Sequence, residues 1–334
     1  MDALRFHGDG ELAPGLLDLA VNVRGDAPPP WLLSRLTRAL PKLGAYPTVA
    51  PAVAAVSRRH GRDPSEVLVT NGAAEAFVLL ARALRPAHAV CVHPSFTEPE
   101  AALVAAGHAV TRLLLDAPYV LDPSAVPASA DLVVLGNPTN PTGVGHERIA
   151  QLCRPGRVVV VDEAFADAVP GEPLSLAGRD DLPGLVVVRS LTKTWALAGL
   201  RVGYLLASPS LVSQLRAVQP AWAVSSLAVA ALDACLAPGP VAAAARTAQE
   251  LADLRRSLEA GLGALGVEVS PGSVAPFLLC RVPGDAGLRL RLRAEGVAVR
   301  RGETFPGLTA EHWRVAVRSA EANETLLAAV AKTV

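Results

Sequence analysis

The sequence is poor in cysteine and aromatic residues and has no excess of either charge. It has four cysteines without CxxC spacing, which argues against a disulfide framework or a zinc site. They are predicted to be reduced core residues: Cys91, Cys153, Cys235 and Cys280. Lys plus Arg and Asp plus Glu each total 31, so the net charge is zero and no basic stripe is present. We therefore expect neither a bound metal nor a nucleic-acid partner.

Long apolar runs are also missing. The first ten residues contain no apolar core typical of a signal peptide, and no segment reaches the ~18 apolar residues of a membrane span. Residues 241–264 come closest, but charged residues interrupt them, namely Arg246, Glu250, Asp253, Arg255 and Arg256. We expect a cytoplasmic location and no membrane partner. With 334 residues, 51% of them hydrophobic, the chain can form one large or two modest domains with a sizeable core.

A lysine with several phosphate-binding side chains follows an apolar run. Residues 185–188 are rich in β-branched residues and predict a buried strand. Burial lowers the pKa of a lysine such as Lys193, and a neutral amine can attack a carbonyl. Ser190, Thr192 and Arg201 supply the hydroxyls and the guanidinium that suit a phosphate. The stretch predicts a phosphorylated aldehyde held as a Schiff base, which describes pyridoxal phosphate (PLP). The alternative is a strand end with a snorkelling lysine.

Strands alternate with helices over residues 67–206, which predicts an α/β domain with a mostly parallel sheet. Asp162 follows four valines, so it lies at the carboxyl end of a strand, where α/β sheets bind ligands. An aspartate there can hydrogen-bond a pyridinium nitrogen. Residues 136–143 form a rigid double turn that aims Asn140. Residues 70–75 open a helix whose amino terminus suits a phosphate.

The remaining segments predict a second, smaller unit. Residues 1–30 form an arm, and the helices and strands after residue 220 form an α+β unit. The predicted division is therefore a large PLP-binding domain at 31–220 and a small domain at 1–30 and 221–334. His7 stands beside glycine in the arm, where a flexible polar tip is the alternative to a site residue.

The order and spacing of these parts resemble the fold type I PLP enzymes, in the branch of the histidinol-phosphate aminotransferases. The chain resembles the threonine-phosphate decarboxylases of cobalamin biosynthesis still more closely. That finer resemblance lies in residues 189–193 with 198–201, in 220–224, and in 305–308 with 313–320. The resemblance covers nearly the whole chain and implies a PLP-dependent transferase fold.

The resemblance also implies roles at the cofactor. Lys193 forms the Schiff base and moves protons, and Asp162 pairs with the pyridine nitrogen. Tyr46 reaches the cofactor phosphate of the other subunit, which implies a homodimer with shared sites. Further cofactor contacts, to the ring, its phenolic oxygen or its phosphate, are implied for Ala73, Ala74, Phe96, Asn140, Ser190, Thr192 and Arg201.

The implied substrate is a small phosphorylated amino acid. Arg314 matches the arginine that grips the substrate carboxylate. His7, Arg300 and Arg318 are implied as contacts of the substrate phosphate.

Two positions depart from the pattern of the related aminotransferases. Phe165 stands where they have tyrosine, which removes a hydroxyl from the cofactor and favours the decarboxylase branch. Asn22 is kept in the substrate-binding loop, but Arg24 replaces its second asparagine. Arg24 is either a surface residue or an added cation for an acidic substrate group.

The resemblance implies PLP-dependent decarboxylation of O-phospho-L-threonine to (R)-1-aminopropan-2-yl phosphate. The alternative is transamination of histidinol phosphate or a related amino acid with 2-oxoglutarate. A non-catalytic PLP-binding protein is a third hypothesis, which the intact Lys193 and Asp162 disfavour. The same residues serve both reactions, and the bond that stands perpendicular to the ring decides between them.

Overall fold

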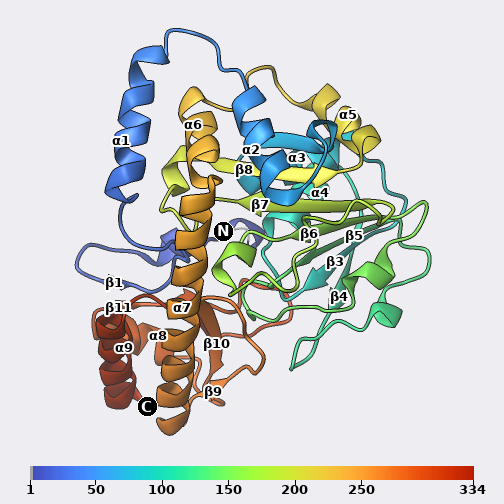
Figure 1. Cartoon of the computed structure of the whole chain (residues 1–334). Coiled ribbons are helices and arrows are strands. Elements are labelled where there is room, and N and C mark those ends of the chain that lie inside the picture. The colour runs from blue at the N-terminus through green and yellow to red at the C-terminus, as the bar shows by residue number, and fades with distance from the viewer. Residues whose placement is uncertain (1–2) are drawn as a thin grey trace.

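The computed structural model describes residues 3–334 and consists of a large sheet with helices on both faces, joined to a smaller α+β unit (Figure 1). The large sheet has seven strands in the order β2-β8-β7-β6-β5-β3-β4. Its strands are β2 (Val67–Asn71), β3 (Ala89–His93), β4 (Val110–Leu114), β5 (Leu132–Gly136), β6 (Val158–Asp162), β7 (Leu185–Ser190) and β8 (Val202–Ala207). β8 runs antiparallel to β2 and β7, whereas the other pairs are parallel. The predicted α/β class with a mostly parallel mixed sheet is confirmed.

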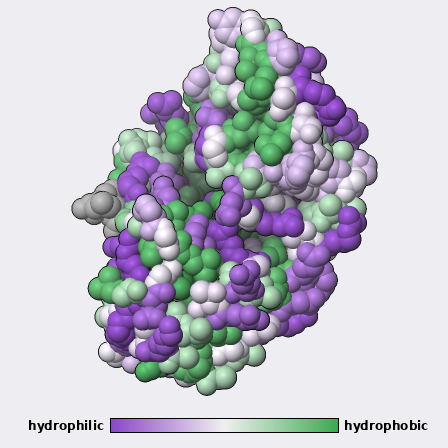
Figure 2. All heavy atoms as spheres, turned by 90° about the vertical axis from the view of Figure 1, so that its left-hand side faces the viewer, coloured by the Kyte–Doolittle hydropathy of each residue, from purple (hydrophilic) through white to green (hydrophobic). Residues whose placement is uncertain are grey.

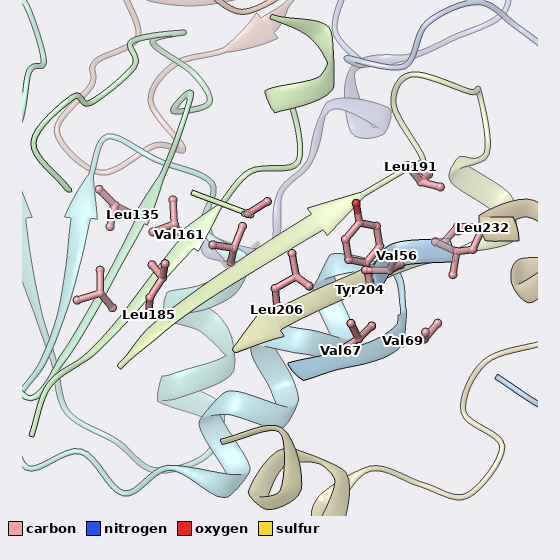
Figure 3. Close-up of a cluster of buried hydrophobic side chains, with 14 of the residues drawn as sticks. Val56, Val67, Val69, Leu135, Val161, Leu185, Leu191, Tyr204, Leu206 and Leu232 are labelled. Atoms are coloured by element: carbon pink, nitrogen blue, oxygen red, sulfur yellow. The ribbon is translucent and has the colours of Figure 1, made fainter. Parts of the chain in front are cut away.

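The valine-rich strands alternate their side chains between two buried layers. Val159 and Val161 face one layer and Val160 the other, as the period of two in a strand requires. The first layer is covered by α1 (Pro30–Ala39), α2 (Ala50–His60) and α6 (Ser226–Cys235), and the second by α3 (Gly72–Ala83), α4 (Glu98–Ala105) and α5 (Pro209–Val218). Figure 3 shows the first layer, in which Leu206 and Tyr204 of β8 lie between Val161 of β6 and Leu232 of α6.

The smaller unit is a four-stranded antiparallel sheet in the order β12-β13-β10-β9, packed against helices. Its elements are α7 (Pro238–Ala264), β9 (Glu268–Val269), β10 (Phe277–Arg281), α8 (Leu288–Ala294), β12 (Arg300–Arg301), β13 (His312–Ala316) and α9 (Ala320–Thr333). The arm joins this unit because β1 (Leu17–Asp18) pairs in parallel with β11 (Val297–Ala298). Residues 297–301 thus form two short strands with different partners, since β11 pairs with β1 and β12 with β13.

The placement of α6 bears on the predicted boundary at residue 220. Sequence patterns assign α6 to the small unit, yet its buried residues pack with α1, α2 and the large sheet. α7 then leads to the small unit at an angle of 73° to α6. The division after residue 220 stays a prediction, but the contacts of α6 extend the core of the large unit beyond it.

No single helix within residues 3–334 has both the length and the apolar character needed to cross a membrane, although α6 and α7 meet those criteria as a bent pair.

Candidate active site

A cavity of about 410 Å³ lies where the carboxyl ends of the central strands face the arm and the small unit. Figure 2 shows a hollow of mixed polar and apolar character between the upper and lower parts of the molecule. Side chains far apart in the sequence meet there. Its lining includes these predicted site residues: His7, Asn22, Ala73, Ala74, Phe96, Asn140, Asp162, Ser190, Thr192, Lys193, Arg201, Arg300 and Arg314.

Lys193 follows β7 and faces this cavity. Burial, with the positive charges of Arg314 and Arg201, lowers the pKa of its amine to about 8, although the negative charge of Asp162 opposes the shift. About a tenth of the amine is therefore neutral at pH 7, far more than for an ordinary lysine, and the neutral form is the one that attacks an aldehyde.

Asp162 ends β6 and lies close enough to Lys193 for their charges to interact. Its carboxylate accepts a hydrogen bond from the Ala164 N–H at 3.0 Å. Burial raises the pKa of Asp162 to about 6, so the carboxylate is mostly ionised at neutral pH. A protonated ring nitrogen beside it would favour the charged form further, which makes this carboxylate a suitable partner for a pyridinium.

Phosphate-binding groups gather at the amino terminus of α3. The hydroxyls of Ser190 and Thr192 are 2.8 Å apart, and the guanidinium of Arg201 lies against Gly72. Gly72 has φ +74, and a Cβ atom there would lie 2.6 Å from Arg201 Nη2. Only glycine therefore allows the guanidinium to approach the helix terminus this closely. Hydroxyls, a guanidinium and free N–H groups at one place fit the phosphate of PLP.

The opposite wall supplies a cation without an acidic partner. Burial lowers the pKa of Arg314 to about 9, and the positive charge of Arg300 contributes. Arg314 donates to Asn140 Oδ1 at 2.7 Å and to the carbonyl of Ala20, while its Nε is buried without a partner. No carboxylate of residues 3–334 forms an ion pair with this guanidinium. A substrate carboxylate would satisfy both the charge and the unpaired N–H.

His7 and Arg300 also line the cavity. The His7 ring lies 5.5 Å from that of Phe96, and His7 Nε2 is 2.8 Å from Glu98 Oε1. Burial lowers the pKa of Arg300 to about 10, and its guanidinium donates to the Phe6 carbonyl at 2.8 Å. The structure therefore brings together two of the three side chains predicted to bind a substrate phosphate.

Arg24 and Arg318 are not brought to that site. They line a second cavity of about 590 Å³, and Asn22 lies between the two cavities because it lines both. Arg318 donates to Asp18 Oδ2 at 3.0 Å and to the Val21 carbonyl, so its charge is already paired. Arg318 therefore does not line the cavity that His7 and Arg300 line, although Lys193 lines both cavities. The substrate contacts predicted for Arg24 and Arg318 stay predictions.

Tyr46 does not line the cavity of its own chain. Its side chain is 77% exposed and stacks on Trp222 at 4.2 Å between ring centroids. An exposed aromatic pair is compatible with the predicted contact to another subunit, which stays a prediction.

Several residues at the site were not predicted from the sequence. Glu98 pairs with both Arg5 and His7, and Phe305 lines the cavity beside Arg300. The sequence could have identified Gly72, since it belongs to an Asn-Gly turn before a helix. It could not have identified Glu98, because the partners of Glu98 lie about ninety positions away in the sequence.

The comparisons with known proteins identify the family of the chain. The family model "Aminotransferase class I and II" matches residues 18–330. The chain belongs to this family. Its listed relatives include a histidinol-phosphate aminotransferase of Mycobacterium tuberculosis, 53% identical over 95% of this chain and 87% of the relative. The threonine-phosphate decarboxylase of Salmonella typhimurium is 33% identical over 83% of this chain and 79% of its own length.

A solved structure shows the same fold. The histidinol-phosphate aminotransferase of Sinorhizobium meliloti, determined in complex with PLP, has a TM-score of 0.82 at 21% identity and covers 94% of this chain and 89% of its own. The fold type I assignment and the PLP cofactor predicted for this family member are confirmed. The closer resemblance to the decarboxylases is not, because the decarboxylase match is the more distant one.

Bound PLP draws electrons away from the bonds at the substrate Cα. The residues of this chain determine what is bound and where protons go. Lys193 would supply the amine that holds the aldehyde and could then carry a proton at Nζ. Asp162 would keep the ring nitrogen protonated, and Arg314 would orient a carboxylate.

Proposed function

We propose that this PLP-dependent enzyme is an aminotransferase acting on histidinol phosphate or a related phosphorylated amino compound, with 2-oxoglutarate as amino acceptor. The observation that carries the proposal is the pair of arginines in one cavity. Arg314 offers a charge unpaired by any described carboxylate, and Arg300 with His7 offers a second cationic region. The name and 53% identity of the mycobacterial relative support the same reaction.

In this proposal each of the two arginines binds a different substrate. Arg314 binds the carboxylate of glutamate or 2-oxoglutarate, and Arg300 binds the phosphate of the other substrate. Both place the substrate Cα near Lys193, whose neutral amine accepts the Cα proton. The site thus serves alternately a phosphorylated amine and a dicarboxylic partner.

Decarboxylation of O-phospho-L-threonine is the second candidate, and Phe165 favours it. The Phe165 ring is buried at the cavity and packs edge-on against Phe277 at 4.9 Å. It provides an apolar surface where a tyrosine would supply a hydroxyl, and an apolar surface favours loss of a charged carboxylate as neutral CO₂. The 33% identity to the Salmonella decarboxylase supports this reaction less strongly.

We also propose that the enzyme is a homodimer. Large apolar side chains are exposed on and beside α1, and Figure 2 shows hydrophobic surface over the upper part of the molecule. These side chains are Trp31, Leu33, Leu40, Leu43, Tyr46 and Val49. A contiguous apolar surface of this kind is typical of a protein interface. The cytoplasmic location stays a prediction.

A substrate screen that follows CO₂ and keto acids together tests the proposal. The holoenzyme is incubated with histidinol phosphate plus 2-oxoglutarate, and separately with O-phospho-L-threonine. We expect glutamate to form in the first mixture and no CO₂ in the second. Release of CO₂ from phosphothreonine without 2-oxoglutarate, and no glutamate from histidinol phosphate, would establish the decarboxylase instead.

A further inference from the structure

Glu11 is a buried acid at the edge of the arm, outside the cavity lining. It is 2% exposed. Its carboxylate accepts from Arg301 Nε at 2.6 Å, from the Arg301 backbone N–H at 3.2 Å and from Arg289 Nη1 at 3.2 Å. Burial opposes ionisation, but the hydrogen bond from Arg301 and the charge of Arg289 hold the pKa of Glu11 below its ordinary value. Arg293 also donates to the Glu11 carbonyl, so the residue is held by side chain and backbone together.

These contacts of Glu11 hold the segment of the arm that reaches the cavity. Phe6 lies under the guanidiniums of both Arg300, at 4.8 Å from its ring centroid, and Arg301, at 4.2 Å. A Cβ atom at Gly8 would lie 2.4 Å from the Ala20 carbonyl oxygen, so the arm packs tightly at that point. At the other end of the arm, Glu98 on α4 accepts from Arg5 at 2.7 Å and pairs with His7. The arm is thus tied to both units on either side of the cavity.

Glu11 makes direct ion pairs with some of its neighbouring arginines and not with others, although its negative charge also acts on Arg300. Arg289 and Arg301 form ion pairs with Glu11. Arg300 donates only to the carbonyls of Phe6 and Arg301, and no ion pair to it occurs within the described chain. The cation left available to a ligand is therefore the one that lines the cavity.

We infer that Glu11 is a positioning residue for recognition of a substrate phosphate monoester. By neutralising Arg289 and Arg301 and fixing the arm, it makes His7 and Arg300 converge on one anion. The inference rests on the proposed function, because it takes a phosphorylated amine as substrate. It adds a residue that touches neither substrate nor cofactor and acts through Arg301, Phe6 and Arg300.

The test compares two half-reactions of the holoenzyme in Glu11→Gln and Glu11→Asp. Each half-reaction is followed by the absorbance of the bound cofactor, once with histidinol phosphate and once with glutamate. We expect Glu11→Gln to raise the half-saturating concentration of histidinol phosphate about 10-fold, as loss of charged hydrogen bonds predicts, and Glu11→Asp to restore part of it. Half-saturation by glutamate, which uses Arg314, should change less than about 2-fold. The inhibition constant of inorganic phosphate, acting as a competitive inhibitor, should rise by the same factor as the half-saturating concentration of histidinol phosphate.

Glu311→Gln is the matched control, because Glu311 pairs with Arg281 on the surface of the same unit. It should leave both half-reactions unchanged. If Glu11→Gln does not fold, Arg289→Gln removes one contact to Glu11 and should weaken histidinol phosphate about 2- to 3-fold. An unchanged response to histidinol phosphate, or an equal loss for glutamate, would overturn the inference. A wild-type enzyme that turns over glutamate but no phosphorylated amine would instead overturn the proposed function.

Discussion

The wall of the cavity formed by the large sheet and the wall formed by the arm and small unit hold their side chains by different means. On the sheet wall, Asp162 and Lys193 follow the parallel strands β6 and β7, which the sheet itself places side by side. On the opposite wall, Arg300 meets Phe6 across 294 positions of sequence, and Arg314 meets Asn140 across 174. The cofactor side is therefore set by sheet topology, whereas the substrate side depends on individual long-range contacts. Substitutions on the sheet wall should therefore affect cofactor binding, and substitutions on the opposite wall should affect substrate binding.

Removing the amine of Lys193 should give the largest effect. Lys193→Ala leaves no group to hold the aldehyde or carry the Cα proton, so turnover should fall about 10⁴-fold. The visible absorption of lysine-bound cofactor should disappear at the same time. Lys332→Ala, which removes an exposed ion pair with Glu295, is the control and should change neither. A Lys193→Ala protein that kept the visible band would refute the assignment of this lysine.

Conservative changes on the substrate wall should separate the two substrates. Arg314→Lys loses the planar guanidinium that binds a carboxylate through two hydrogen bonds, so the glutamate half-reaction should lose about 10²-fold in kcat/KM. Arg300→Lys should instead weaken the phosphorylated substrate and spare glutamate. Both variants should keep the visible band, because neither side chain belongs to the sheet wall. Equal losses for both substrates in both variants would show that the cavity does not divide the work in this way.

The pH dependence of cofactor capture tests the sheet wall without a substrate. With a Lys193 pKa of about 8, the neutral fraction of the amine rises from about a tenth at pH 7 to about nine tenths at pH 9. The rate at which apoprotein captures PLP should rise about 10-fold over this range. Because the folded pKa lies below the ordinary 10.5, this group's contribution to the free energy of unfolding also rises between pH 8 and 10.5.

Asp162→Asn provides the comparison for that profile. The Asp162 charge raises the pKa of Lys193, so its removal should move the midpoint of capture to lower pH. A midpoint that stayed near the ordinary lysine value in wild type would show that burial does not tune this amine.

The two walls also differ in how far the sequence predicts them. Valine-rich strands at 158–161 and 185–188 end in polar residues, and parallel strand ends meet at one sheet edge, so Asp162 and Lys193 could be placed together. The position of Arg318 could not, because only the fold shows that Asp18 pairs with it. Likewise, nothing local in the sequence connects Glu11 with Arg301, 290 positions away. The existence of the strands is encoded locally, whereas ion pairs between distant segments depend on the final packing.

Elements with weak patterns were also missed on the sheet side. β4 at Val110–Leu114 is an edge strand with three exposed positions among five, so its hydrophobic pattern is weak. α2 at Ala50–His60 is largely alanine, valine and basic residues, and its helical character appears only where Ala52 and Val56 pack on the sheet. Their absence from the prediction did not affect the site, because neither contributes a side chain to the cavity.

Arg24→Ala is the substitution with the smallest expected effect. It tests whether the substrate site extends into the second cavity. The Arg24 side chain is exposed beside the second cavity, while its backbone N–H donates to the Lys193 carbonyl at 2.9 Å. Arg24→Ala keeps that backbone bond, so half-saturation by the phosphorylated substrate should change less than about 2-fold. Arg318→Ala removes the ion pair with Asp18 and should instead lower the free energy of unfolding by about 1 kcal/mol. If Arg24→Ala weakened the phosphorylated substrate 10-fold with the same thermal stability, the second cavity would belong to the substrate site, and the wall would extend past Asn22.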